Sequence, residues 1–202
     1  MSNRRPLVAA FLLALVFTGG CDREVAQRDG VLVRRDPIQR QIARPRRFAV
    51  DGFEVEAVAE YDIEGRVLRR HIYPSLLPFV GYAQAVERVS PIDLALGWGL
   101  MSDNAVLAQL NMFQGHRFFA WSPRSGDFAL SVAEINRHSS NNHVIPASRE
   151  IRAQLMALRR GDLVRLVGEL VNVRSRTRSW TTSTTREDNG CEVIYVRTVE
   201  RL

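Results

Sequence analysis

Residues 161–173 have the sequence GDLVRLVGELVNV, and this stretch decides the expected fold. Its apolar residues Val164, Leu166 and Leu170 fall on alternate positions, which is the period of a β-strand with one buried face. Gly168 occupies the same face in the middle of the run. Because a glycine inside a strand commonly marks a bulge or a tight bend, the stretch predicts one strand of a strongly curved sheet.

The segments that follow predict two more strands. Residues 179–184 (SWTTST) and 191–199 (CEVIYVRTV) are rich in β-formers, and Asn189 and Gly190 between them favour a hairpin turn. The stretch 161–173 is itself similar to the opening strand of an OB-type barrel. The expected fold class is therefore α+β, with a small, strongly curved or barrel-like (OB-like) antiparallel sheet and short helices.

The clearest predicted helix lies just before this sheet. In residues 148–161 (SREIRAQLMALRRG), Ile151, Leu155 and Leu158 fall at i, i+4 and i+7, and Gly161 suits the C′ position. Further strands are predicted over 50–58, 61–73 and 116–121, with a long connection over 73–91 and an extended piece over 143–146. Two short helices are also predicted: one capped by Ser102, and one over 132–138 with a capping box of Ser131 and Glu134.

A short apolar run stands near the start of the chain, where residues 11–21 have the sequence FLLALVFTGGC. As a helix, the fourteen apolar or small residues 7–20 span about 21 Å, which is less than the roughly 30 Å hydrocarbon core of a bilayer. With Arg4 and Arg5 in front, the order of basic, apolar and small residues is typical of a secretory signal peptide. Residues 1–20 are therefore predicted to be a signal peptide.

The end of this run, TGGC, resembles the lipobox of bacterial lipoproteins, although Thr18 stands where leucine is usual. The resemblance implies a lipid on Cys21 and anchoring in a membrane. Asp22 is similar to the residue that keeps enteric lipoproteins on the inner membrane, so the periplasmic face of that membrane is favoured. The alternative is an exported protein in which Cys21 is only the first mature residue.

The charge of the chain is unevenly distributed. All 28 basic residues are arginines; residues 22–47 hold eight of them against four acids, whereas residues 48–202 hold eighteen of each sign. The surplus predicts an Arg-rich, disordered tether over 21–47 that can lie on anionic lipid, followed by one globular domain over 48–202. Because the domain has no basic stripe interleaved with aromatic residues, no nucleic-acid partner is expected.

Cys21 and Cys191 are the two cysteines. If Cys21 is lipidated, Cys191 is left as a buried thiol; if it is not, a disulfide between the two becomes possible in an oxidising compartment.

One polar stretch, residues 137–146 (RHSSNNHVIP), is a candidate site. His138 and His143, with His71 or His116, could supply imidazole ligands to zinc and so form a metal-dependent hydrolase. The alternative is that this polarity belongs to a helix end and a turn. No GxSxG or HExxH motif supports hydrolysis, and the spacing of the two histidines is no recognised ligand pair.

Two further features suggest binding rather than catalysis. Trp98, between two glycines, could line a groove for a glycan or peptide together with Trp121 and Trp180, or these residues could be part of the core. Arg174, Arg176 and Arg178 alternate, and on one face of a strand they would meet an anionic ligand.

The stretches SPIDLALGWGLMSDNAVLAQL, HSSNNHVIP, RRGDLVRLVGELV and STTREDNGCEVIYV together resemble a set of uncharacterised exported proteins of proteobacteria. The resemblance implies a self-contained bacterial domain and no mechanism. We therefore expect a membrane-anchored, periplasm-facing lipoprotein that acts as a non-catalytic binding or scaffold module of the cell envelope, without a cofactor. Its expected partners are the lipid bilayer, through Cys21 and the tether, and an envelope protein or anionic ligand. The alternative is the hydrolase that uses His138 and His143.

Overall fold

The structure, a computed structural model, describes residues 24–73, 83–126, 128–176, 178–185 and 191–202. The predicted signal peptide, Cys21 and Asp22 lie outside the described residues, as does the hairpin turn predicted at Asn189 and Gly190.

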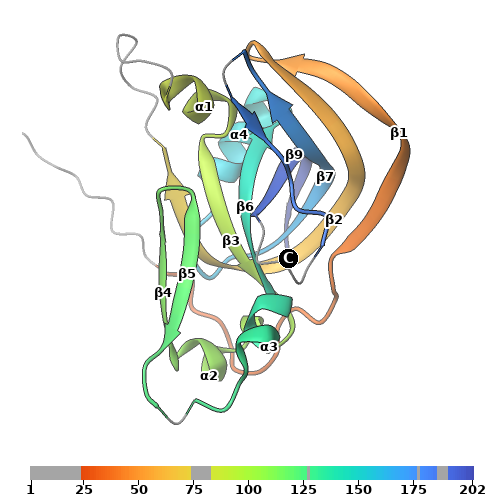
Figure 1. The fold of residues 1–202 in the computed structure, drawn as a ribbon. Helices are drawn as coiled ribbons and strands as arrows, with labels where there is room; N and C mark the ends of the chain where they lie inside the picture. The colour runs from red at the N-terminus through yellow and green to blue at the C-terminus, as the bar shows by residue number, and fades with distance from the viewer. Residues whose placement is uncertain (1–23, 74–82, 127, 177, 186–190) are drawn as a thin grey trace, which may run out of the picture.

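The chain is a mixed α+β protein built mostly of strands (Figure 1). In chain order the elements are β1 (Ile38–Val50), β2 (Phe53–Ile72), α1 (Ala83–Val89), β3 (Ile92–Gly97), a 3-10 turn (Gly99–Ser102), α2 (Asn104–Leu107), β4 (Leu110–Gly115), β5 (Phe118–Pro123), α3 (Val132–Arg137), β6 (Ser139–Pro146), α4 (Arg149–Met156), β7 (Leu163–Arg174), β8 (Ser179–Trp180) and β9 (Cys191–Arg201). Among the described residues, no helix combines the length and the apolar character needed to cross a bilayer.

The main sheet follows the order β1-β2-β3-β6-β9-β7-β8 and is curled. It curls because β2 pairs with β1 and then β3 along one edge and with β7 along the other. The two strands predicted over 50–58 and 61–73 are in fact this one strand, with a bulge between Ala57 and Ala59. The sheet is antiparallel except for β6 and β9, which run parallel. β4 and β5 form a separate hairpin.

The predicted irregularity at Gly168 is confirmed. The pairing of β7 with β9 shifts register between Val167 and Gly168, and a Cβ on Gly168 would overlap the carbonyl oxygen of Tyr195. Only glycine lets the two backbones approach this closely.

Alternate residues of β3 face two different cores. Leu94 and Leu96 belong to the main cluster, which includes Leu166 of β7 and Leu155 of α4. Ala95 faces the opposite side, where the β4–β5 hairpin and α3 pack over the sheet. The hairpin therefore covers the outer face of β3, and this is where the site described below lies.

The structure corrects the disordered tether predicted over residues 21–47, because the described part of that segment is packed on the domain. Val33 is buried in the main core, and its N–H donates to the Ser102 hydroxyl over 3.0 Å. The Val25 N–H donates to the Arg160 carbonyl over 2.8 Å. β1 then adds an edge strand to β2.

Three of the eight arginines that suggested a tether, Arg35, Arg46 and Arg47, are paired with acids of the domain. Counting charges by segment missed this, because the partners lie on β2 and β7 and meet the arginines only in the folded chain. The ion pairs are Arg35 with Asp62 and Glu64 at 2.8 and 2.7 Å, Arg46 with Glu169 at 2.6 Å, and Arg47 with Glu56 at 2.8 Å.

The predicted helices are present, but some of their caps and ends differ from the predictions. The capping box of Ser131 and Glu134 on α3 is confirmed. α2 is capped by Asp103 rather than Ser102, whose hydroxyl instead accepts from the N-terminal segment. α4 ends at Met156, so Gly161, with φ of +89°, lies in the turn that follows instead of at C′. α1, β3 and β4 were not predicted.

Candidate functional site

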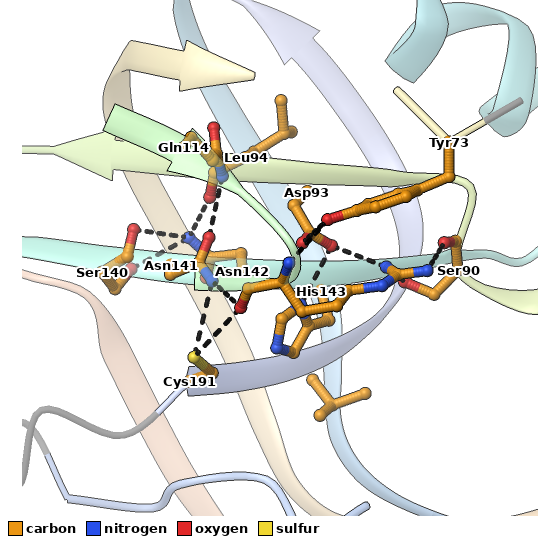
Figure 2. Close-up of polar contacts among 12 residues, drawn as sticks. Tyr73, Ser90, Asp93, Leu94, Gln114, Ser140, Asn141, Asn142, His143 and Cys191 are labelled. Atoms are coloured by element: carbon orange, nitrogen blue, oxygen red, sulfur yellow. Dashed lines mark hydrogen bonds and ion pairs between the residues drawn. The ribbon is translucent and has the colours of Figure 1, made fainter. Parts of the chain in front are cut away.

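A buried carboxylate organises the outer face of β3. Asp93 is 0% exposed, and its oxygens accept from three side chains: Tyr73 Oη at 2.8 Å, Arg117 Nη1 at 2.8 Å and His143 Nδ1 at 2.9 Å (Figure 2). Asp93 and His143 are direct partners in the pairing of β3 with β6, which is why their side chains meet. Such a buried charge is stable only because it is paired and hydrogen-bonded.

Arg117 joins the β4–β5 hairpin to this carboxylate. His116 and Arg117 form the hairpin tip with φ of +52° and +69°, and the Arg117 N–H donates to Tyr73 Oη over 2.9 Å. The guanidinium also donates to the Ser90 hydroxyl and carbonyl at 3.1 and 2.9 Å, and it lies 3.6 Å from the centre of the Tyr73 ring. The Arg117 side chain therefore links the hairpin tip to the sheet, together with the backbone N–H of the same residue.

Cys191 is the first residue of β9 and lies opposite Asn141 of β6. Its thiol is free and partly exposed, and Asn141 Nδ2 is 3.4 Å from the sulfur. The same amide donates to the Arg117 carbonyl over 3.0 Å, so the position of Asn141 is fixed from the hairpin. His143, two residues further along β6, hydrogen-bonds Asp93 and interacts electrostatically with the Cys191 thiol. Figure 2 shows these side chains facing one another.

This arrangement changes the acidities of the thiol and the imidazole. Burial by itself lowers the pKa of His143, but the hydrogen bonds with Asp93 and Cys191 outweigh it and raise the pKa to about 9. Burial by itself raises the pKa of Cys191, but the hydrogen bonds from His143 and Asn141 outweigh it and lower the pKa below its ordinary value. Burial, with Asp93 nearby, raises the pKa of Tyr73. The imidazolium and thiolate forms are thus both favoured.

A pocket of about 550 Å³ opens beside Cys191. One wall comes from β5 and includes Phe118, which is 68% exposed, and Trp121. The facing wall comes from β6 and β9 and includes Ser139, Asn141 and Cys191. This size and this mixture of aromatic and polar lining are typical of small-molecule sites.

The predicted histidine pair is not brought together. His138 caps the C-terminus of α3, where its Nδ1 contacts the Glu134 carbonyl at 2.7 Å, whereas His143 lies about 16 Å further along extended chain. His71 packs on the Tyr73 ring, and His116 is at the hairpin tip. In the part of the chain that the structure describes, no group of three or more His, Cys, Asp or Glu side chains is arranged to hold a metal ion.

Of the other predicted binding residues, Trp121 lines the pocket, whereas Trp98, Trp180 and the three arginines do not. Trp98 is 2% exposed within the main core, so the core alternative is correct. Arg174, Arg176 and Arg178 are exposed but do not share one strand face, because β7 ends at Arg174 and Ser175 begins a turn in which its N–H donates to the Arg178 carbonyl.

Comparison with known proteins finds neither a matching family model nor a matching curated protein. Sequence reasoning missed Tyr73, Asp93 and Arg117, and it identified His143 and Cys191 only separately. One signal was available: Asp93 interrupts the apolar run PIDLALG, and an acid in a run of that kind needs a buried partner.

Proposed function

We propose that this chain is a lipid-anchored, periplasm-facing binding module of the cell envelope whose ligand site is the pocket beside Cys191. The observation that carries the binding role is the pocket itself, which is lined by the exposed Phe118, by the partly buried Trp121 and by hydroxyl and amide groups of β6. The leader sequence and its TGGC ending support the location.

The lining defines the class of ligand. Phe118 and Trp121 favour a flat or aliphatic apolar group, and Ser139 and Asn141 favour a hydrogen-bonding group. The ligand we propose is therefore a small amphipathic molecule, such as an acyl or aryl group linked to a carbonyl.

The strand pairings support an OB-like barrel as the finer description of the fold. Pairing runs from β2 to β3, β6, β9 and β7 and returns to β2. In OB-type barrels, ligands bind on the outer face of the second and third strands, together with neighbouring loops. The pocket lies against β6, and the Asp93 network lies on the outer face of β3 and β6, so the proposed site agrees with this description.

The packed N-terminal segment sets how the domain would sit on a membrane. Glu24 forms ion pairs with Arg66 and Arg160 at 3.4 and 3.3 Å. If Cys21 carries lipid, three residues, about 10 Å of extended chain, separate the lipid from the body. We therefore propose a domain seated at the bilayer surface rather than one on a long leash. Detergent phase partitioning of wild type and Cys21→Ser tests the anchor. If Cys21 carries lipid, wild type should enter the detergent phase and the variant should move to the aqueous phase.

Binding is tested with 1-anilinonaphthalene-8-sulfonate, an amphipathic fluorescent probe that combines aryl and anionic groups. We expect saturable fluorescence with one site per chain, lost in Ser139→Trp, which fills the pocket from β6. Asn111→Trp is the matched control, because Asn111 is exposed on β4 outside the pocket lining. Equal binding by wild type and Ser139→Trp would contradict the assignment of this pocket.

A further inference from the structure

Three neighbouring strands carry a thiol, an imidazole and a carboxylate in a row. Cys191 is on β9, His143 on β6 and Asp93 on β3, and each strand pairs with the next. We propose that Cys191 is a nucleophile that takes an acyl group from an ester or thioester held in the pocket, with His143 as its acid–base partner and Asp93 as the positioning residue. This activity uses the pocket of the proposed function and therefore rests on it.

The hydrogen bonds fix which imidazole nitrogen faces the thiol. Asp93 Oδ1 lies 2.9 Å from His143 Nδ1, so Nε2 is the ring nitrogen left to exchange a proton with the thiol, with which His143 interacts electrostatically. This is the order of groups that activates a cysteine nucleophile: a base within reach of the thiol, and a third group that orients the base. Cys191 also lines the pocket, so a bound carbonyl can reach its sulfur.

The charges around the site leave the imidazolium free to pair with the thiolate. The charged or titratable groups that face it are Asp93 on β3, Arg117 on the hairpin, and Tyr73 at the end of β2. Arg117 already balances the carboxylate of Asp93 over 2.8 Å. Asp93 therefore does not depend on His143 to compensate its charge, and the positive charge of His143 can stabilise the thiolate of Cys191.

The reaction is balanced with water as co-reactant. The Cys191 thiolate attacks the carbonyl carbon, a C–S bond forms, the bond to the leaving group breaks, and His143 Nε2 gives its proton to the leaving oxygen or sulfur. Neutral His143 then takes a proton from water, the hydroxide attacks the acyl-cysteine, and the acid leaves as the thiolate is restored. Asn141 Nδ2, 3.4 Å from the sulfur, is placed to donate to the oxyanion of both steps.

The test uses the full chain carrying Cys21→Ser, so that Cys191 is its only thiol, with p-nitrophenyl acetate as the probe. We expect an acetyl group on Cys191 by peptide mass spectrometry and turnover beyond one equivalent of p-nitrophenolate. Cys191→Ala should lose both signals. His143→Gln should lose turnover, whereas the matched control His138→Gln, which replaces a histidine on α3 that does not contact the thiol, should keep it.

A second readout follows the ionisation of the thiol. A fully ionised thiol would have a thiolate fraction at pH 7 about thirtyfold above that of an ordinary cysteine, which sets the ceiling, and the lower nucleophilicity of a more acidic thiol removes part of that gain. We therefore expect iodoacetamide to alkylate wild type several-fold faster than His143→Gln at pH 7, with a midpoint at lower pH than in the variant. A midpoint near 8.5 in both proteins, or acetylation elsewhere than Cys191, would overturn the proposal.

The two proposals fail separately. If Cys191→Ala still binds 1-anilinonaphthalene-8-sulfonate while wild type shows no acetylation, the nucleophile is refuted and the pocket stands. If neither wild type nor Cys191→Ala binds the probe, the pocket itself is refuted. Circular dichroism of each variant separates loss of chemistry from loss of fold.

Discussion

Replacement of Arg117 by methionine should show how far one side chain holds the hairpin to the sheet. Methionine keeps most of the aliphatic length but removes the guanidinium, which contacts Asp93, the hydroxyl and carbonyl of Ser90, and the face of Tyr73. Asp93 is fully buried, so it would lose its closest permanent cation without gaining water.

The magnitude follows from what remains around Asp93. Removing one partner of a buried ion pair costs about 3–5 kcal/mol, because the other charge stays buried. Tyr73 Oη and His143 Nδ1 still donate to Asp93, which places the loss toward the lower end of that range. The lost contacts with Ser90 add about 1 kcal/mol. We expect the free energy of unfolding to fall by about 4 kcal/mol at pH 7.

Urea unfolding followed by tryptophan fluorescence measures this change. Arg124→Met is the control, because Arg124 is on the same hairpin, is exposed and donates from Nε only to the Leu110 carbonyl at 3.1 Å. Its expected cost is about 0.5 kcal/mol. If Arg117→Met and Arg124→Met cost the same, the Asp93 network does not anchor the hairpin, and the reasoning is refuted.

Three further changes test the core, the N-terminal segment and the acid–base pair. Gly168→Ala should cost about 3 kcal/mol or more in thermal unfolding because its Cβ overlaps the backbone of β9, whereas Gly126→Ala, with open space around it, should be nearly neutral. Val33→Ala should cost about 2 kcal/mol in urea unfolding, and a cost near zero would mean that its segment is not part of the core. In Cys191→Ser, Asp93 should still hold the pKa of His143 above its ordinary value, but less far above it than in wild type because the contribution of the thiol is lost; the stability this gives should be fully present below pH 6.5 and should fall as pH rises above it. The free energy of unfolding of wild type should change less between pH 6.5 and 8.5, because its folded thiolate and imidazolium together hold as many protons as the unfolded thiol and neutral imidazole. Urea unfolding at several pH values measures this dependence in both proteins. Equal slopes against pH would exclude the coupled pair.

Local patterns in the sequence were sufficient for the strands and helices that have a clear apolar period. β7 and α4 were predicted from alternation and from the i, i+4, i+7 spacing, and Gly168 marked the bulge. β3 was missed because it is buried on both faces and shows no alternation. β1 was missed because its arginines meet acids on other strands, Glu56 of β2 and Glu169 of β7, and a count of charges by segment cannot detect such pairs.

The candidate site could be predicted only in parts. The sequence identified His143 as a possible ligand and Cys191 as a thiol, but their meeting depends on the parallel pairing of β6 with β9. A parallel pair brings together segments joined by a long connection, which no local spacing announces. Arg117 enters through a turn with positive φ at two residues that are not glycine, which is also invisible to periodicity.

The charge balance of the cluster explains how one network can serve both structure and chemistry. With Asp93 and Cys191 negative and Arg117 and His143 positive, the net charge is zero; with the thiol and imidazole both neutral, it is zero again. Moving the proton between sulfur and nitrogen therefore changes no net charge in a region of low dielectric, where an uncompensated charge costs several kcal/mol. A nucleophile must pass between these two states in each reaction. Because Arg117 holds Asp93 in both, the hairpin can stay anchored while the proton moves.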